Sequence, residues 1–196
     1  GFLEQMGRLR TLLMDKTGTL THGKPKVVEM KAFNGVDEKG VLYWAAIAEK
    51  RSEHPLARAV TEKAESFGLS IPHPESFENF RGKGVKSRWN SKTILAGSPE
   101  LLKGEGIEIL ESVREWLRVK ESEGKTSLLI TLDHQLVGVI SIADTLREKA
   151  KATIEKIRGE GVSEIWMLTG DSDQVASRIG KELGIRHEAR LLPEQK

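Results

Sequence analysis

The sequence LRTLLM (residues 9–14) followed by DKTGTLT (residues 15–21) decides the fold. The apolar run predicts a buried strand, and the polar residues from Asp15 onward predict a loop at its carboxyl end. Open α/β sheets bind their ligands at that end of their parallel strands. Gly18 lets the loop turn tightly, and the Thr hydroxyls and backbone N–H groups can hold an anion. Asp15 can then act as a nucleophile toward a phosphoryl group and form an aspartyl phosphate. For a bare Asp-x-Thr the default interpretation would instead be a strand-ending turn with an N-capping Asp, which the full seven-residue string disfavours.

Residues 27–137 mix amphipathic helices with strands that form hairpins. The predicted helices cover residues 37–50, 52–67 and 107–123, and a short fourth helix opens at 98–100. The predicted hairpin turns lie at 90–92 and 133–135. Ser52 is the expected N-cap of the second helix, and Pro55 falls in its first turn. This part of the chain therefore predicts an α+β domain with an antiparallel sheet.

From Asp144 onward the pattern alternates between helix and strand. The predicted elements are a helix at 147–158, a strand at 162–168 and a helix at 173–183. Together with the strand at 9–14, they indicate a Rossmann-like parallel sheet with right-handed crossovers. The fold class is thus α/β, with residues 1–26 and 138–196 forming a parallel-sheet domain into which residues 27–137 are inserted.

The composition is that of a soluble globular protein, with 38% hydrophobic and 31% charged residues. The 31 basic and 29 acidic residues leave a formal net charge of +2, so we expect no nucleic-acid partner. The absence of cysteine excludes disulfides and thiolate metal sites. No segment reaches the roughly 18 apolar residues of a membrane span, so any membrane part of the function would lie outside these residues.

Two weaker patterns lie in the inserted domain. In SEHPLA (residues 52–57), Glu53 and His54 project from a helix N-terminus, where free N–H groups favour anions. A lone surface histidine there more often has no role. In RGKGV (residues 81–85), Gly82 and Gly84 leave a strand edge without side chains, so that a ligand can approach the backbone. An ordinary bulge or hairpin is the likelier interpretation of two such glycines alone.

The string DKTGTLT resembles the phosphorylation motif of P-type ATPases, which sits on a haloacid dehalogenase-like phosphorylation domain. The resemblance implies that Asp15, with Lys16 and Thr17, forms the catalytic loop. Phosphatases of that superfamily generally carry a second Asp two residues after the nucleophile, as general acid and base. Thr17 stands at that position here. The departure favours a pump, whose phosphoenzyme hydrolyses slowly by itself, over a soluble phosphatase.

The SEHPLA string resembles the His-Pro signature of the heavy-metal subgroup, whose members transport copper, silver, zinc, cadmium, lead or cobalt. The resemblance implies that His54 and Glu53 line an adenine pocket. Gly82 and Gly84 are similar to the family's Gly-x-Gly nucleotide-binding segment. Together with the DKTGTLT string, these motifs imply ATP as the bound nucleotide.

AGSPELL (residues 96–102) falls where the family often has Gly-Asn before a leucine pair. Gly97 matches this pattern, which implies a further nucleotide contact. Ser98 replaces the usual Asn, and capping of the next helix explains it without a nucleotide.

The resemblance extends to the second half of the parallel-sheet domain. DTLR (residues 144–147) resembles a stretch near the phosphate end of the family's site, although Asp144 could equally cap the next helix. TGD (residues 169–171) supplies Thr169, Gly170 and Asp171, and in the family the threonine holds a phosphoryl oxygen. Lys196, after LLPEQ, matches the lysine that offsets charge on the transferring phosphoryl group.

Magnesium is the implied metal, with Asp15 and the Thr17 carbonyl as its candidate ligands. The family's next motif, Gly-Asp-Gly-x-Asn-Asp, supplies a further Asp ligand and is absent from this sequence. The implied partners are the actuator and transmembrane domains of a full-length pump, with this part in the cytoplasm and the transported ion bound elsewhere. The alternatives are a soluble phosphatase of the same superfamily and a nucleotide-binding module without catalysis.

Overall fold

The structure is a computed structural model, and it describes residues 9–191 and 193–195. Its contacts divide the chain into two compact units. Unit 1 comprises the described residues up to Lys24, residues 122–124 and the described residues from Asp144 onward. Unit 2 comprises Pro25–Glu121 and Lys125–Ala143.

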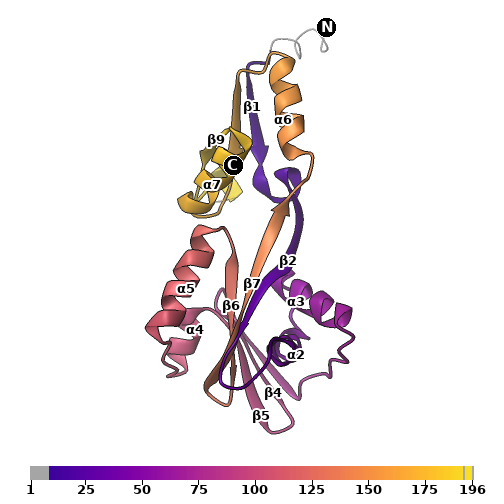
Figure 1. Cartoon of the computed structure of the whole chain (residues 1–196), viewed down its shortest axis with the longest axis vertical. Coiled ribbons are helices and arrows are strands. Elements are labelled where there is room, and N and C mark those ends of the chain that lie inside the picture. The colour runs from indigo at the N-terminus through magenta and orange to yellow at the C-terminus, as the bar shows by residue number, and fades with distance from the viewer. Residues whose placement is uncertain (1–8, 192, 196) are drawn as a thin grey trace. The chain divides into compact units, whose positions relative to one another are not determined.

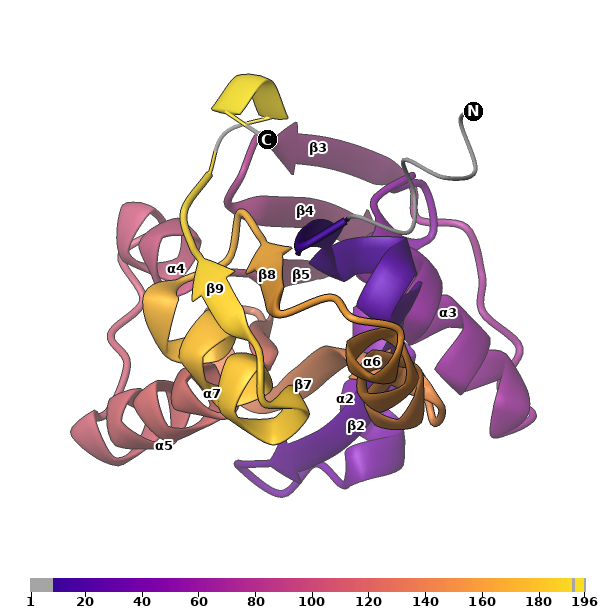
Figure 2. The ribbon, with the colours of Figure 1, turned by 90° about the horizontal axis from the view of Figure 1, so that it is seen from above.

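Unit 1 contains a three-stranded sheet in the order β1-β8-β9 (Figure 1). The strand β1 (Thr11–Asp15) pairs in parallel with β8 (Glu164–Leu168), which pairs in parallel with β9 (Arg186–Glu188). Figure 2 shows β8 and β9 side by side. The helix α6 (Ala150–Gly159) precedes β8, and α7 (Asp173–Leu183) joins β8 to β9. The predicted parallel sheet with alternating helices is confirmed.

The core of unit 1 lies on one face of this sheet. Its buried side chains are Leu20, Ala150, Ile154, Ile165, Met167, Ala176, Ile179, Leu183 and Ile185. On β1, Leu13 is 59% exposed, and before it Leu9 is 50% exposed. The expectation of a buried strand at 9–14 is therefore wrong, because β1 lies at the sheet edge and α6 and α7 pack against alternate strand residues only. Trp166 of β8 lies 5.3 Å from the guanidinium of Arg186.

Unit 2 is built on a six-stranded sheet in the order β2-β7-β6-β5-β4-β3. Its strands are β2 (Thr21–Ala32), β3 (Ser76–Phe80), β4 (Gly84–Trp89), β5 (Lys92–Gly97), β6 (Thr126–Leu132) and β7 (Gln135–Leu146). Neighbours from β3 through β7 pair antiparallel. The predicted antiparallel sheet is thus confirmed, and β2 and β7 carry the chain between the two units.

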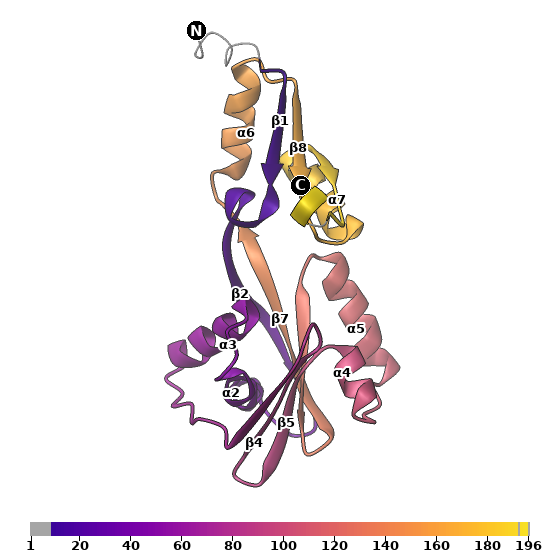
Figure 3. The ribbon, with the colours of Figure 1, turned by 180° about the vertical axis from the view of Figure 1, so that it is seen from behind.

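Helices cover both faces of this sheet (Figure 3). On one face lie α2 (Glu38–Glu49) and α3 (Pro55–Ser66), and on the other lie α4 (Pro99–Gly104) and α5 (Glu111–Ser122). Because side chains alternate along a strand, Ile94 and Ala96 pack with α2 and α3, whereas Leu95 packs with α4 and α5. Three of the four tryptophans, Trp44, Trp89 and Trp116, pack in this unit.

Two helix starts differ from the prediction. The N-cap of α3 is His54 rather than Ser52, because Pro55 occupies the first helical turn and the His54 side chain accepts from the backbone of that turn. The helix predicted at 107–123 begins only at Glu111, so Leu110 precedes α5, and it is 72% exposed.

The two predicted hairpins are confirmed, each with a two-residue turn. Asn90 and Ser91 have φ values of 49° and 61°, and Asp133 and His134 have 47° and 67°. Positive φ at both positions is the geometry that matches the twist of a tight hairpin. Beyond the sheets, the described chain closes with a short helical turn, η2 (Pro193–Gln195). Among the described residues, no helix has the length and apolar character to cross a membrane.

Candidate functional site

The loop after β1 is a single tight turn, η1 (Lys16–Leu20). Gly18 adopts a φ of 78°, which a residue with a Cβ rarely does, and Thr17 is extended within the turn. Thr21 is fully buried at the end of the turn, and its Oγ1 accepts from the Gly18 N–H at 3.2 Å. The last residue of the DKTGTLT string therefore fixes the turn from within.

Asp15 lies at the same sheet edge as the TGD loop. In the parallel register of β1 and β8, Asp15 is paired with Leu168, so Thr169 begins the loop beside it. Thr169 is 2% exposed, and its Oγ1 accepts from the Asp171 N–H at 3.1 Å. In that bond the Thr169 oxygen is the acceptor, so the hydroxyl proton of Thr169 can still be donated to a ligand.

An ion pair joins these two loops. Lys16 Nζ lies 2.6 Å from Asp171 Oδ2, and the Lys16 side chain is only 12% exposed. Lys16 is thus directed to the neighbouring loop, where Asp171 neutralises it. Gly170, between the two TGD side chains, is exposed, and an added Cβ there would lie 3.3 Å from the Leu191 carbonyl.

Asp144, on β7, supports the turn η1 that follows Asp15. Its Oδ2 accepts from Thr21 Oγ1 at 2.5 Å. Its Oδ1 is buried and has no hydrogen-bond partner among the described residues. The alternative that Asp144 caps the next helix is wrong, because α6 begins at Ala150 with Lys149 in the capping position.

Arg147, the last residue of the DTLR string, received no role of its own in the sequence interpretation. Its guanidinium donates to the carbonyls of Gly18 at 2.9 Å and Thr19 at 3.0 Å, and its backbone N–H donates to the Leu20 carbonyl at 2.9 Å. Arg147 thus stabilises the turn η1 through three hydrogen bonds to its backbone carbonyls. The DTLR string contained the signal, since its arginine follows the aspartate by three residues. Lys196, the other predicted phosphate-site residue, lies outside the described residues.

The donor atoms near Asp15 are of the kind that magnesium prefers. A carboxylate and a backbone carbonyl, from Asp15 and Thr17, are hard oxygen ligands, and Mg²⁺ is commonly held by one or two carboxylates with phosphate oxygens and water. No cluster of three or more His, Asp or Glu side chains suited to a metal occurs in the described part of the chain. The residues therefore fit a magnesium ion that shares its coordination with a bound phosphate.

Unit 2 contains a separate cavity of about 370 Å³. One wall is the α2–α3 connection with Glu53 and His54, and another is the β3–β4 turn with Gly82. Apolar walls come from Leu56, Phe80, Val85 and Leu128. A cavity with apolar walls and few polar groups is the usual form of a small-molecule site.

His54 has a defined role in the cavity wall. Its Nδ1 accepts from the Leu56 N–H at 3.2 Å and so caps α3. An Nδ1 that accepts carries no proton, so the neutral ring has its proton on Nε2. His54 therefore offers a donor on the side that does not face the helix. Glu53, its neighbour, is exposed on the same wall.

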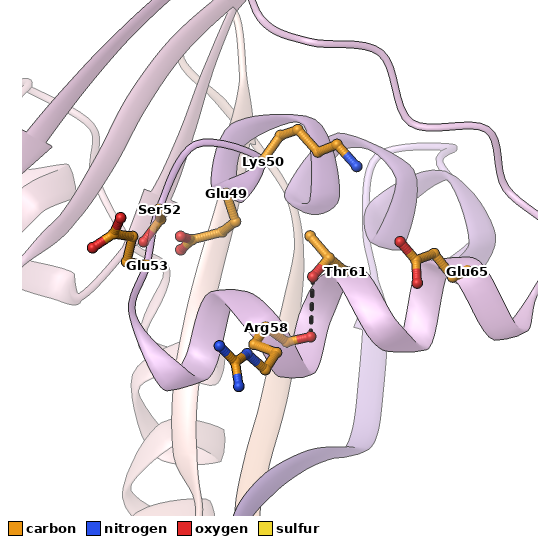
Figure 4. A pocket seen from close by; sticks show the side chains of 7 residues that line it. All are labelled: Glu49, Lys50, Ser52, Glu53, Arg58, Thr61 and Glu65. Carbon is orange, nitrogen blue, oxygen red and sulfur yellow. Dashed lines mark hydrogen bonds between the residues drawn. The ribbon is translucent and has the colours of Figure 1, made fainter.

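Glu49 is a residue that the sequence interpretation missed. It ends α2 and is only 5% exposed, and it lines both this cavity and a second one between α2 and α3 (Figure 4). Figure 4 shows its carboxylate on the side of Ser52 and Glu53. Burial raises its pKa to about 7, and a hydrogen bond with Ser52 lowers it by less. From sequence, a glutamate at a helix end is expected to be solvated.

The three predicted glycines have different surroundings. Gly82 lies in the β3–β4 turn with a φ of 72° and open space where a Cβ would be. Gly84 and Gly97 are cross-strand partners, and a Cβ on either one would collide with the backbone of the other strand. Gly82 therefore borders the cavity, whereas Gly97 serves close strand packing and does not line it.

Ser98 does line the cavity. It occupies the N-cap position of α4, but its hydroxyl makes no capping bond. Its Oγ is buried and has no hydrogen-bond partner among the described residues. The expectation that capping explains Ser98 is therefore wrong, because no N–H group of α4 donates to its hydroxyl.

Comparison with known proteins gives a consistent family. A model described as haloacid dehalogenase-like hydrolase matches residues 9–195. A manganese-exporting P-type ATPase of Mycobacterium bovis is 39% identical over 99% of this chain and 27% of its own length. A copper-exporting P-type ATPase of Bacillus subtilis is 37% identical over 99% of this chain and 24% of its own. The chain thus spans about a quarter of the length of these relatives.

Solved structures agree with these sequence relatives. The crystal structure of a zinc-transporting PIB-type ATPase in the E2.Pi state superposes with a TM-score of 0.83 and 35% identity. The match covers 98% of this chain and 31% of that protein. The catalytic domain of the CPx-ATPase CopB-B superposes with a TM-score of 0.70 and 25% identity, over 99% of this chain and 68% of the other.

Proposed function

The chain belongs to the haloacid dehalogenase-like hydrolase family, and from that premise we propose that it is the ATP-binding and phosphate-accepting part of a heavy-metal P-type ATPase. The observation that supports this most is the position of Asp15. It lies at the carboxyl end of β1, at the edge shared with Thr169, before a turn fixed by Gly18. The two loops at that edge are joined by the Lys16–Asp171 ion pair.

Asp15 would act as the nucleophile. One of its carboxylate oxygens forms a bond to the γ-phosphorus of ATP while the bond to the β-phosphate oxygen breaks, so that ADP leaves and an aspartyl phosphate remains. Thr169 would donate its hydroxyl proton to a phosphoryl oxygen. Lys16 and Asp171 position the two loops rather than contact the phosphate. Thr17, in place of the second aspartate of the phosphatases, leaves no carboxylate there to activate water.

Magnesium would be held by Asp15 and the Thr17 carbonyl. When bound, the ion supplies positive charge that stabilises the transferring phosphoryl group. Asp144 would keep the turn in the shape that presents these oxygens, since its bond to Thr21 restrains the last residue of the turn.

Unit 2 would bind the nucleotide. The cavity of about 370 Å³ has apolar walls for a base, and His54, Gly82 and Ser98 also line it. The side chains of Glu53 and His54 would contact the bound ATP. Gly84 and Gly97 would contribute by bringing β4 and β5 close together.

The whole protein would be a membrane pump. The relatives carry names for the export of manganese, zinc or copper, and they are about four times as long as this chain. The actuator and transmembrane domains of such a pump would be the partners of this part, on the cytoplasmic side. The transported ion would be bound by those other domains and would belong to the same heavy-metal class.

Labelling with γ-labelled ATP and magnesium, together with calorimetric titration of ATP, tests the proposal. We expect an acid-stable, hydroxylamine-sensitive label in a protein that contains this chain, and none in the Asp15→Asn variant. The variant should bind ATP with unchanged affinity, because Asp15 lies in unit 1 and the nucleotide cavity lies in unit 2. Loss of ATP binding in Asp15→Asn would contradict this division of labour, and turnover of generic phosphate esters would indicate a phosphatase instead.

A further inference from the structure

Arg190 has a backbone conformation that its residue type rarely adopts. Its φ is 57°, a region in which non-glycine residues are uncommon and Asn and Asp are the usual occupants. Among the described residues, the others that share this property are Asn34, in the turn after β2, and the four residues of the two hairpin turns. Arg190 belongs to no such turn, since it lies two residues beyond the end of β9. Strain of this kind persists only where the surrounding structure holds it, and it is frequent at functional sites.

The structure that holds Arg190 is the TGD loop. β9 runs beside β8 (Figure 2), and its last residue, Glu188, accepts a hydrogen bond from the Thr169 N–H at 3.0 Å. The Leu191 N–H donates to the Thr169 carbonyl at 3.1 Å. Both backbone groups of Thr169 therefore bond to this one stretch of chain. The Arg190 N–H donates to the Asp171 carbonyl at 2.9 Å, which adds a third bond.

The left-handed φ of Arg190 explains how two consecutive N–H groups reach the same loop. In an extended strand, successive residues face opposite sides, so neighbouring N–H groups cannot both donate to one partner segment. A left-handed residue turns them to the same side. The Arg190 side chain is exposed and forms no hydrogen bond or ion pair with the residues that the structure describes. The role of this residue therefore lies in its backbone.

The TGD loop and residues 188–191 are also packed closely. An added Cβ on Gly170 would lie 3.3 Å from the Leu191 carbonyl, so the loop has little room to shift toward that stretch. Asp171, whose carbonyl accepts the bond from Arg190, pairs through its side chain with Lys16 at 2.6 Å. A displacement of residues 188–191 would therefore reach both the TGD loop and the residue next to Asp15.

We propose that Arg190 is a positioning residue of the phosphoryl-transfer site, and that its left-handed backbone sets the place of the Thr169 hydroxyl. This inference rests on the proposed function, in which Asp15 accepts the phosphate and Thr169 donates to a phosphoryl oxygen. A misplacement of about 1 Å in such a site can slow a reaction by about 100-fold. The rate of phosphorylation should therefore depend on the conformation of Arg190, whereas ATP binding in the cavity of unit 2 should not.

The rate of labelling by γ-labelled ATP, in a protein that contains this chain, provides the first test. Arg190→Val keeps the backbone N–H, but a β-branched residue is strongly disfavoured at positive φ. Its labelling at saturating ATP should be slower by about tenfold or more. The ATP concentration that gives half the maximal rate should stay within about twofold, since the cavity lies in unit 2. Arg190→Gly adopts the same φ without strain and should restore the wild-type rate.

A variant in the core of unit 1 separates positioning from a general loss of stability. Ile154, on α6, is 1% exposed in that core. Ile154→Val should lower the melting temperature and leave the labelling rate unchanged. An equal loss of rate in Ile154→Val and Arg190→Val would assign the effect to stability and overturn the inference. An Arg190→Gly protein as slow as Arg190→Val would assign it to the arginine side chain and overturn the inference as well.

Amide hydrogen exchange of the chain itself, followed by nuclear magnetic resonance, tests the same bonds without the reaction. The N–H groups of residues 169, 190 and 191 should exchange slowly in the wild type and in Arg190→Gly, and about tenfold or more faster in Arg190→Val. If Arg190→Val does not fold, Arg190→Thr, which is also β-branched, takes its place in both experiments. Unchanged exchange at these N–H groups in a folded β-branched variant would overturn the inference.

The two proposals fail in different ways. A wild-type protein that formed no label on Asp15 would contradict the phosphate-accepting function itself. A wild-type protein that formed the label, with an Arg190→Val variant that formed it at the same rate, would leave that function intact and overturn only the role of Arg190.

Discussion

The residues around Asp15 come from distant parts of the sequence. Lys16 pairs with Asp171 at 2.6 Å, and Thr21 donates to Asp144 at 2.5 Å. The sequence predicted Asp15, Thr169 and Asp144 as members of one site, because each belongs to a motif. It did not predict which side chains pair, because those pairings depend on the register of β1 beside β8 and on the path of β7.

His54 has two separable roles. Its Nδ1 caps α3, and its Nε2 would contact the nucleotide. We expect the His54→Ala variant to lose both the capping bond and the nucleotide contact. Its free energy of unfolding should fall by about 1 kcal/mol, and it should bind ATP severalfold more weakly. His54→Asn should restore the stability, since asparagine is a good N-cap, but not the affinity. Urea denaturation and calorimetry measure the two effects, and recovery of ATP affinity in the Asn variant would show that His54 acts only as a cap.

At the scale of elements, local pattern predicted most of the strands and helices. Apolar alternation located β4 and β5, and the turn between them has the expected polar residues. The wrong predictions concern the burial of single side chains, which depends on how separate elements pack together. Glu49 is buried at the end of α2, where residues of α3, β3, β4 and β6 surround the same cavity. Leu13 is exposed because α6 and α7 pack on the opposite face of the sheet. Neither arrangement can be derived from periodicity within one element.

The β3–β4 turn and the β4–β5 pairing predict different costs for glycine substitution. Gly82→Ala should reduce the unfolding free energy by about 1 kcal/mol, because alanine is strained at positive φ while space is open around it. Gly84→Ala should cost about 2–3 kcal/mol, because its Cβ would collide with the Ala96 carbonyl. Urea denaturation measures both.

Gly82→Asn is the control for the turn, since asparagine tolerates positive φ. It should recover most of the stability that Gly82→Ala loses. Equal losses for Gly82→Ala and Gly84→Ala would contradict the distinction between a turn glycine and a packing glycine.

For the whole molecule, the two units have separate cores and separate candidate sites. The cavity proposed to bind the nucleotide is lined by unit 2 alone, and the Asp15 loop with its supporting side chains belongs to unit 1. Sequence patterns predicted that one domain is inserted in the other. Composition and periodicity did not predict which ligands bind, because a cavity forms only when distant strands and helices meet. The prediction of ATP and magnesium came from the family resemblance.

This separation predicts that residues 25–143 fold alone and bind ATP as tightly as the full chain does. All residues that line the cavity and both cores of unit 2 lie within that range. Calorimetric titration of the fragment and of the full chain under the same conditions compares the two. A fragment that is folded by circular dichroism but binds ATP more weakly would show that residues of unit 1 contribute to the affinity.

The contact between Trp166 and Arg186 has an optical consequence. Trp166 is the one tryptophan of unit 1, and the other three lie in unit 2. With phenylalanine at those three positions, all tryptophan emission would come from the strand that ends beside Thr169. The fluorescence intensity of Trp166 would then report the unfolding of unit 1 and the state of the TGD loop. Unit 2 would contribute no tryptophan fluorescence.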